Sequence, residues 1–300
     1  MHKVSGTITV VPPFKLSLSV HFLEIFRQMS DEQELIDGSI TKALMVRGQT
    51  ILFKVIQTGT KDSDPVEYEL ISSVPLAKTV RENVINRISF FLSLKEDIAP
   101  FYEIAKKEDS VFYPVVKRFR GFHHVKFLTP FEAVTWAILA QRIPMPAAMK
   151  MKQRLVESYG SSIEFEGKKY WAFPDYSQLK DLTVKEIYAI TGNRLKTEFL
   201  DSLFRVWKRI DESSLLKLDF GKAKDLLMEI NGIGEWSATF ILSRGLGRME
   251  QLPKNMKTII PEIHRMYGLD MPVEKINAIY GKWVGYWLLY LWTTSLITNH

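Results

Sequence analysis

The sequence predicts an α+β protein in which a small antiparallel sheet precedes an all-helical region. Two observations carry this prediction. Before about residue 78, short segments are rich in β-branched and apolar residues, and one alternates apolar with polar positions. From about Val80 onward, apolar residues recur with helical spacing between helix start and stop signals. We therefore expect two domains, residues 1–78 and residues 79–300.

Three segments of the first domain have the pattern of strands: residues 7–11, 51–56 and 66–70. The third alternates apolar and charged residues, as in a strand with one buried face. A cluster of turn residues at 58–65 separates the last two strands. The segment after Leu16 fits either a helix or a strand.

Capping signals divide the second domain into helices. Thr129 to Glu132 combines an N-cap threonine, a proline at the first helical position and a glutamate at the third. Pro144 and Pro146 end that helix and begin another, which stops at Gly160. Further helices are predicted over residues 184–193, 194–210, 222–230, 235–244 and 256–267, and in the Trp-rich C-terminal segment.

Composition restricts the class of protein. With 46% hydrophobic and 12% aromatic residues, the chain is too apolar to be disordered. It contains no cysteine, which excludes disulfides, thiolate metal sites and cysteine nucleophiles. No secretory signal is recognised, and the longest apolar run near the end, WVGYWLLYLW, is far shorter than the roughly 20 residues of a membrane span. We expect a soluble cytoplasmic protein.

The excess positive charge lies in the second domain. The formal net charge of the whole chain is +6, with −1 in residues 1–78 and +7 in residues 79–300. Excess positive charge favours a polyanionic partner. If the protein binds nucleic acid, the helical domain should therefore carry the binding surface.

The most informative local feature is Asn231-Gly232-Ile233-Gly234-Glu235, which joins two predicted helices. The glycines permit a tight turn and keep side chains off its surface, so that a phosphate backbone can approach the main chain. Backbone N–H groups at the start of the next helix would donate to phosphates without reading sequence, while Ile233 holds the two helices together. A purely structural αα-hairpin fits the same residues. Basic residues flank the turn: Lys222, Lys224, Arg244 and Arg248.

The segment GIGEWSATFILSRGLG resembles the helix–hairpin–helix DNA glycosylase superfamily, in particular its 3-methyladenine DNA glycosylase II (AlkA-like) branch. Further matches follow in order along nearly the whole chain, from PFKLSLSVHFL and GSITKALMVRGQTILFKVIQTG, through the central helical segment, to WLLYLW. The resemblance implies base excision repair: a glycosylase domain over residues 79–300 flips an alkylated purine out of double-stranded DNA and hydrolyses its bond to the sugar. It implies a monomer without a cofactor, except for the option of a monovalent cation on the hairpin carbonyls.

The catalytic acid of this family is missing from the expected place. Family members carry an aspartate about 20 residues after the hairpin tryptophan, and the count from Trp236 reaches Met256. The count back from Tyr267-Gly268 reaches the same residue. A shift of one residue places Asn255 there, and an amide supplies no negative charge. Loss of such electrostatic stabilisation typically lowers the rate by about 10²–10³-fold.

Several interpretations therefore stay open. A cationic alkylated base is a good leaving group that could depart slowly without the acid. Glu235 or Glu262 could take over, although each also fits a solvated helix surface. A catalytically silent protein that binds damaged DNA is the main alternative, and a scaffold without a DNA partner is a weaker one. Since Trp236 occupies the position of the lysine nucleophile of lyase-type relatives, we expect no lyase activity.

By resemblance, Trp236, Phe240, Trp292 and Met256 would line the pocket for the flipped base, although core packing also explains the aromatic residues. Gln141-Arg142 stands where the family places a wedge that fills the gap in the duplex. A surface arginine fits equally well. Finally, His123, His124 and His264 show no metal-binding spacing, so we expect them to be structural or exposed and predict no side-chain metal site.

Overall fold

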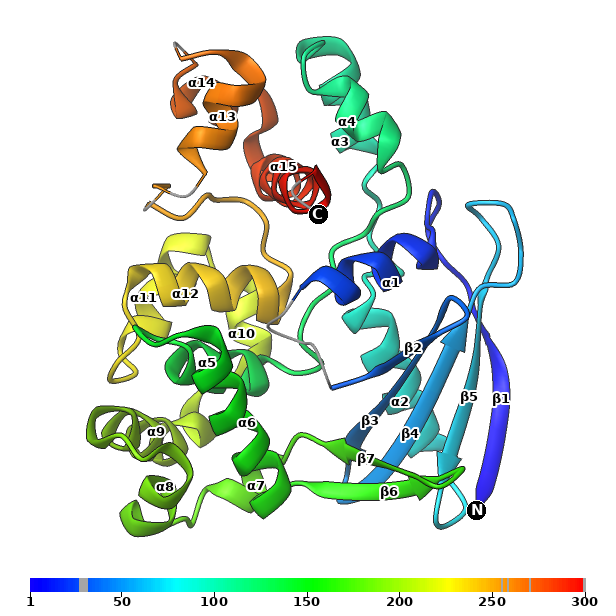
Figure 1. The fold of residues 1–300 in the computed structure, drawn as a ribbon, viewed down its shortest axis with the longest axis vertical. Helices are drawn as coiled ribbons and strands as arrows, with labels where there is room; N and C mark the ends of the chain where they lie inside the picture. The colour runs from blue at the N-terminus through cyan, green and yellow to red at the C-terminus, as the bar shows by residue number, and fades with distance from the viewer. Residues whose placement is uncertain (27–31, 255, 258, 270, 299–300) are drawn as a thin grey trace.

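A computed structural model describes residues 1–26, 32–254, 256–257, 259–269 and 271–298 (Figure 1). Its amino-terminal part is a five-stranded antiparallel sheet of order β1-β5-β4-β3-β2. The strands are β1 (His2–Ile8), β2 (Glu34–Ile36), β3 (Ser39–Val46), β4 (Gln49–Ile56) and β5 (Val66–Ser72). The segment that fitted either a helix or a strand is a helix, α1 (Leu16–Ile25).

The predicted strands at 51–56 and 66–70 are confirmed as parts of β4 and β5. The prediction over 7–11 is wrong for most of its length, because β1 ends at Ile8. Val11 instead donates its N–H to the carbonyl of Leu94, 2.8 Å away, and two prolines without N–H groups follow. Strand β3 was not predicted because nearly all its residues are buried, so its sequence shows no alternation.

The rest of the chain is mainly helical, which confirms the predicted fold class. Its α-helices are α2 (Lys78–Phe91), α3 (Ala99–Glu108), α4 (Tyr113–Arg118), α5 (Pro130–Leu139), α6 (Met145–Tyr159), α7 (Tyr176–Leu179), α8 (Val184–Thr191), α9 (Arg194–Val206), α10 (Glu212–Lys217), α11 (Phe220–Met228), α12 (Glu235–Phe240), α13 (Ile260–Tyr267), α14 (Val273–Tyr280) and α15 (Val284–Thr298). Short 3₁₀ turns are η2 (Trp207–Arg209) and η4 (Gly281–Trp283), and η3 (Ile241–Gly245) is a π-helical turn.

One part of this region is not helical. Strands β6 (Ser161–Phe165) and β7 (Lys168–Ala172) form a hairpin that lies against the amino-terminal sheet (Figure 1). Its two-residue turn, Glu166-Gly167, has positive φ at both positions, as hairpin turns of this length require. The hydroxyl of Thr50 donates to Ser161 at 2.6 Å and ties the hairpin to β4.

Two hydrophobic cores organise the molecule. The first joins α1 and the sheet to α2–α4 and to the returning helices α13–α15. The second lies among the middle helices α5–α12. Phe240 of α12 packs against both cores and therefore marks the seam between them. The division at residues 78 and 79 stays a prediction.

Among the described residues, no helix combines the length and the apolar character that crossing a membrane requires.

Candidate nucleic-acid interface and base cavity

The turn between α11 and α12 presents its main chain at the surface. Gly232 has φ +87°, and a Cβ there would lie 2.4 Å from ring atoms of Phe199. Both the backbone conformation and the lack of space therefore favour glycine at this position. Ile233 is buried in the second core and closes the turn by donating its N–H to the carbonyl of Ile230 at 3.0 Å. Asn231 and Gly234 are exposed. This arrangement leaves the backbone accessible to a large anion.

Glu235, the first residue of α12, is held between two lysines. Its Oε1 lies 2.7 Å from Nζ of Lys254 and 2.9 Å from Nζ of Lys224. Hydrogen bonds from Lys254 and then Lys224 lower the pKa of this carboxyl group, so it is ionised. Glu262, the other glutamate considered as a substitute acid, pairs with Arg265 at 2.8 Å. Both carboxylates are thus engaged outside the cavity described below.

The flanking basic residues differ in their surroundings. Lys222 is exposed. Arg248 donates to the carbonyls of Leu215 at 2.8 Å and Leu218 at 3.0 Å and pairs with Glu250 at 2.6 Å. Its guanidinium therefore braces the fold, and its predicted part in binding DNA, as a basic residue beside the turn, stays a prediction.

The loop between α5 and α6 is attached to the hairpin. Gln141 donates its side-chain N–H to the carbonyl of Gly232 at 2.7 Å. Lys196 of α9 donates to the carbonyls of Ile138 and Gln141, at 3.0 and 2.8 Å, and so caps the end of α5. Arg142 is exposed and has φ +52°. Of the predicted wedge pair, Gln141 is thus engaged within the protein and Arg142 faces solvent.

A cavity of about 240 Å³ opens beside Trp236, at the seam between the two cores. Trp236 is 51% exposed and stacks on Phe240, with ring centroids 5.5 Å apart and an interplanar angle of 14°. Trp292 stands edge-on to Phe26 at 5.7 Å. The described lining is Phe26, His124, Trp236, Thr239, Phe240, Ser243, Arg244, Met249, Gln251, Pro253, Ile259, Gly285, Leu288, Leu289 and Trp292.

Met256, predicted at the catalytic position and in the base pocket, is not among the described residues that line this cavity. Met256 is 7% exposed and packs in the first core, where its carbonyl accepts the N–H groups of Ile259 and Ile260. Asn255 lies outside the described residues. No carboxylate and no lysine belongs to the lining that the structure describes.

Sequence reasoning did not identify His124 and Arg244, two polar residues of the lining, as parts of a site. His124 is 1% exposed, and within the described part of the chain its Nδ1 has no hydrogen-bond partner. Burial first, and then the charges of Arg244 and Lys126, hold the pKa of His124 well below its ordinary value, so its imidazole is neutral. Arg244 is also buried, and its guanidinium carbon lies 4.3 Å from the ring centroid of Phe26. Burial lowers the pKa of Arg244 to about 9, which leaves it cationic at neutral pH.

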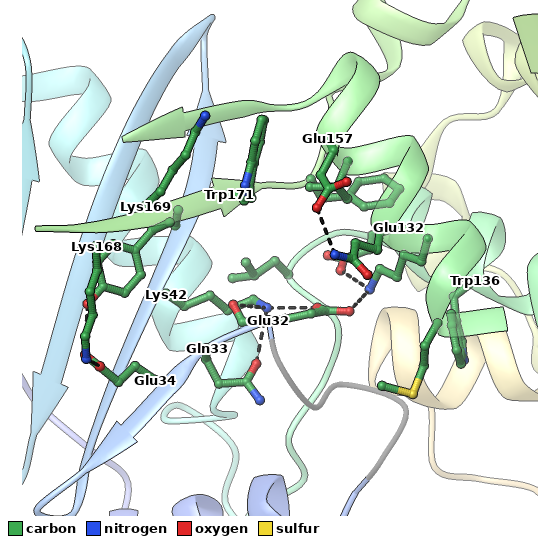
Figure 2. Close-up of a pocket in the computed structure, with 18 residues that line it drawn as sticks. Glu32, Gln33, Glu34, Lys42, Glu132, Trp136, Glu157, Lys168, Lys169 and Trp171 are labelled. Carbon is green, nitrogen blue, oxygen red and sulfur yellow. Dashed lines mark hydrogen bonds and ion pairs between the residues drawn. The ribbon is translucent and has the colours of Figure 1, made fainter. Parts of the chain in front are cut away.

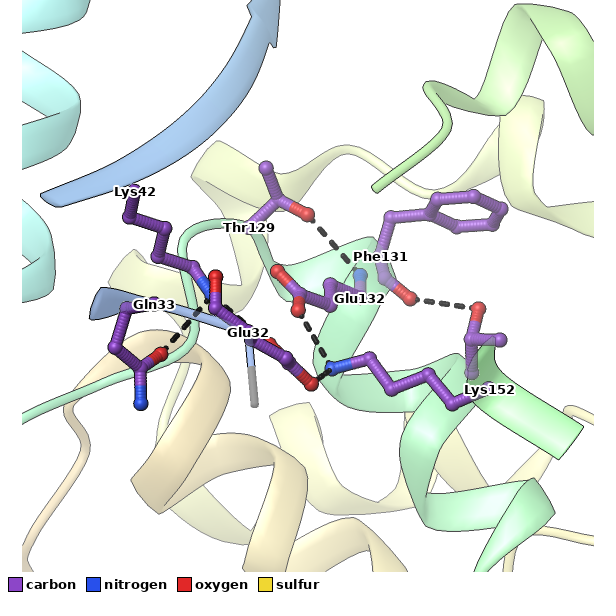
Figure 3. Close-up of polar contacts among 8 residues, drawn as sticks. Glu32, Gln33, Lys42, Thr129, Phe131, Glu132 and Lys152 are labelled. Atoms are coloured by element: carbon purple, nitrogen blue, oxygen red, sulfur yellow. Dashed lines mark hydrogen bonds and ion pairs between the residues drawn. The ribbon is translucent and has the colours of Figure 1, made fainter. Parts of the chain in front are cut away.

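A larger hollow of about 680 Å³ lies elsewhere, between β2, β3 and β7 on one side and α5 and α6 on the other (Figure 2). Six of the eight charged residues in its described lining are paired with one another. Lys152 contacts both Glu132, at 2.8 Å, and Glu32, and Lys42 contacts Glu32 at 2.9 Å (Figure 3). Glu132 lies in the first turn of α5 and donates its N–H to the hydroxyl of Thr129, which confirms the predicted N-cap. This network joins the sheet to the helices.

No protein-family model matches the chain. Over 299 residues, it is 26% identical to the DNA-3-methyladenine glycosylase of Bacillus subtilis (strain 168), with 97% of this chain and 98% of that protein covered. Two solved structures share the fold. The 3-methyladenine DNA-glycosylase from Archaeoglobus fulgidus has a TM-score of 0.74, 20% identity and 97% coverage of both chains. A Clostridium acetobutylicum 8-oxoguanine glycosylase/lyase, in complex with double-stranded DNA, has a TM-score of 0.72 and 18% identity. The alignment covers 100% of this chain and 99% of that protein.

These similarities confirm the predicted resemblance to the helix–hairpin–helix DNA glycosylase superfamily and to its AlkA-like branch. The hairpin leads into the short helix α12, and the cavity lies along that same helix, since Glu235 opens α12 and Trp236 and Phe240 line the cavity. The hairpin is thereby placed beside the cavity.

Proposed function

We propose that this protein is a base-excision-repair DNA glycosylase that acts on damaged, in the first place alkylated, purines in duplex DNA. The DNA backbone would rest on the hairpin from Asn231 to Glu235, with Lys222 adding a phosphate contact. Arg142 would fill the gap that the extruded base leaves. The observation that carries the proposal is the cavity beside the half-exposed Trp236, immediately next to the hairpin turn.

The cavity suits a flat base. The indole of Trp236, the ring of Phe240 and the indole of Trp292 supply stacking surfaces. Enclosure between these rings would remove water from the base–sugar bond, and a hydrolytic water would complete the reaction. Because no lysine is among the described lining residues, we propose a monofunctional hydrolase without lyase chemistry. We also propose that it acts as a monomer, with its glycosylase domain in residues 79–300.

A second function is favoured by one specific observation. No carboxylate belongs to the described lining, and Met256 stands at the position that the family resemblance gives to the acid. Positive charge that develops on the sugar would therefore meet no fixed negative charge. A protein of this kind could recognise damaged DNA without excising the base, and it would then act as a binding protein.

The two functions are separated by a single-turnover excision assay. Purified protein is incubated in excess with a methylated duplex, and released bases are counted against a no-protein control. We expect release that is slow but above the control, since a cationic methylated purine is a good leaving group. Release at the background rate, together with salt-dependent binding of the duplex, would leave the binding protein as the function. Affinity independent of salt would contradict both.

A further inference from the structure

The ammonium group of Lys196 lies at the carboxyl end of α5. This lysine belongs to α9 and is only 4% exposed. Its Nζ donates to the carbonyl of Ile138 at 3.0 Å and to that of Gln141 at 2.8 Å. The last carbonyls of a helix have no partners within it and carry the negative end of its dipole, so a cation satisfies them well. Burial lowers the pKa of Lys196 to about 8, which leaves it cationic at neutral pH.

The loop that follows α5 has an unfavourable backbone conformation. Arg142 has φ +52°, in the left-handed region that residues other than glycine, asparagine and aspartate seldom adopt. A residue keeps such a conformation only where its surroundings fix it. Before Arg142, Lys196 binds the carbonyl of Gln141, and after it, Pro144 is the N-cap residue of α6. The loop is therefore fixed on both sides of Arg142.

Gln141 connects this loop to the hairpin. Its main-chain carbonyl accepts from Lys196, and its side-chain Nε2 donates to the carbonyl of Gly232 at 2.7 Å. One chain of hydrogen bonds thus joins α9, the loop and the hairpin turn, whose bonded residues are 55 and 91 positions apart in the sequence. Arg142, the next residue of the loop, is exposed. A DNA backbone on the hairpin would therefore meet Arg142 at a fixed distance.

Resting on the proposed function, in which Arg142 fills the gap left by the extruded base, we propose that Lys196 is a positioning residue for base extrusion. It holds the loop of Arg142 in a fixed place relative to the hairpin, so that Arg142 enters the duplex when the hairpin binds the backbone. Because Lys196 is buried and its ammonium group faces protein carbonyls, it makes no phosphate contact of its own. Its loss should therefore impair extrusion and leave the binding of undamaged DNA unchanged.

A fluorescent duplex separates extrusion from binding. It carries 2-aminopurine next to an N7-methylguanine whose 2′-fluorinated sugar resists cleavage, and its fluorescence rises when the neighbouring base leaves the stack. We expect this rise with saturating wild-type protein. Lys196→Met keeps an apolar side chain without the charge, and it should lower the equilibrium constant of extrusion about tenfold, as expected for lost hydrogen bonds from a charged donor. Its affinity for an undamaged duplex should equal that of the wild type, and Lys196→Arg, which restores a cation, should regain much of the signal.

Two further variants keep the test decisive if thermal melting shows that Lys196→Met does not fold. Gln141→Leu breaks the link to Gly232 and retains the cation, and we expect the same loss of fluorescence, with no additional loss in the double variant. Lys208→Met makes the same change of charge in the exposed turn η2, beyond the far end of α9, and should leave the signal unaltered.

The outcomes separate this inference from the proposed function. A wild-type fluorescence rise in folded Lys196→Met, or in Gln141→Leu, would overturn the positioning role. Equal losses of affinity for damaged and undamaged duplexes would also overturn it, because Lys196 would then act on DNA binding in general. A wild-type protein that binds no duplex, or that binds without any rise in fluorescence, would instead refute the proposed function, and this inference with it.

Discussion

The two hollows of the molecule have opposite chemistry. Among the described residues, the larger one is lined by four lysines and four glutamates, and its deepest charges are tied to one another (Figure 3). The described lining of the smaller one, beside Trp236, combines aromatic and apolar side chains with uncharged polar ones and one cation, Arg244. The deepest charges of the larger hollow are therefore satisfied by one another, whereas the smaller one contains His124, whose Nδ1 has no hydrogen-bond partner among the described residues.

Volume is thus a poor guide to function in this protein. A buried group whose partners come from the protein itself contributes to the fold, and removing one partner leaves an uncompensated charge. A buried group without a partner contributes little to the fold and is available to a ligand. The larger hollow should consequently govern stability, and the smaller one should govern DNA recognition.

The largest effect should follow from breaking the charged network. We expect Glu132→Leu to lower the free energy of unfolding by about 3 kcal/mol, because buried Lys152 then keeps only Glu32 as a partner. Denaturant titration measures the change. The matched control is the double variant Glu132→Leu with Lys152→Met, which removes both charges and should restore much of the loss. A single variant as stable as the wild type would show that the network is not structural.

The next effect concerns the missing acid. We expect Met256→Asp to raise the single-turnover rate of excision of N7-methylguanine by about 100-fold, by supplying negative charge for the developing sugar cation. Met256→Asn changes the polarity without adding charge and should give no such gain. Since Met256 is buried in the first core, thermal melting must show that both variants fold. Equal rates for the two variants would assign the catalytic position to another residue.

Acid should weaken the charged network. Burial raises the pKa of Glu32, but the charges and hydrogen bonds of Lys152 and Lys42 outweigh it and lower the pKa to about 2. A carboxyl group with a lowered pKa stabilises the fold above its unfolded value of 4.5, and this contribution is lost as the pH falls toward 2. We expect a loss of about 2 kcal/mol across this window, measured by denaturant titration at pH 6, 4 and 3. In Glu32→Gln, the free energy of unfolding should change less between pH 6 and pH 3. A pH dependence equal to that of the wild type would exclude Glu32 as the source of the loss.

Much of the fold could be predicted from local signals. The N-cap at Thr129 and the strand with alternating residues at 66–70 are properties of short segments, and both are present. Strand β3 escaped prediction because burial of nearly all its residues removes the alternating pattern. The β6–β7 hairpin escaped because its signal is a single Glu166-Gly167 turn within a region of helical pattern.

The site was less accessible to sequence reasoning, for a physical reason. The aromatic residues Trp236 and Phe240 could be proposed together because they are one helical turn apart. The environments of His124 and Arg248 depend on chain segments far away in the sequence. His124 lines the same cavity as Arg244, whose charge lowers its pKa, and Arg248 binds the carbonyls of Leu215 and Leu218. Local sequence describes neither environment, so by itself it indicates only a structural or exposed histidine and a basic residue beside the turn.

The smallest effect tests the hairpin surface itself. Lys222 is exposed at the start of α11 and pairs with no carboxylate within the described residues, so its substitution should spare the fold. We expect Lys222→Glu to weaken duplex binding about threefold to fivefold and to reduce the slope of log affinity against log salt by about one, because one phosphate contact no longer releases a counter-ion. Lys61→Glu, in the exposed turn between β4 and β5, is the control of equal charge change and should leave both quantities unaltered. Since Lys222 approaches phosphate and not base, its variant should weaken damaged and undamaged duplexes equally, and a selective loss for damaged duplexes would place it at the cavity instead.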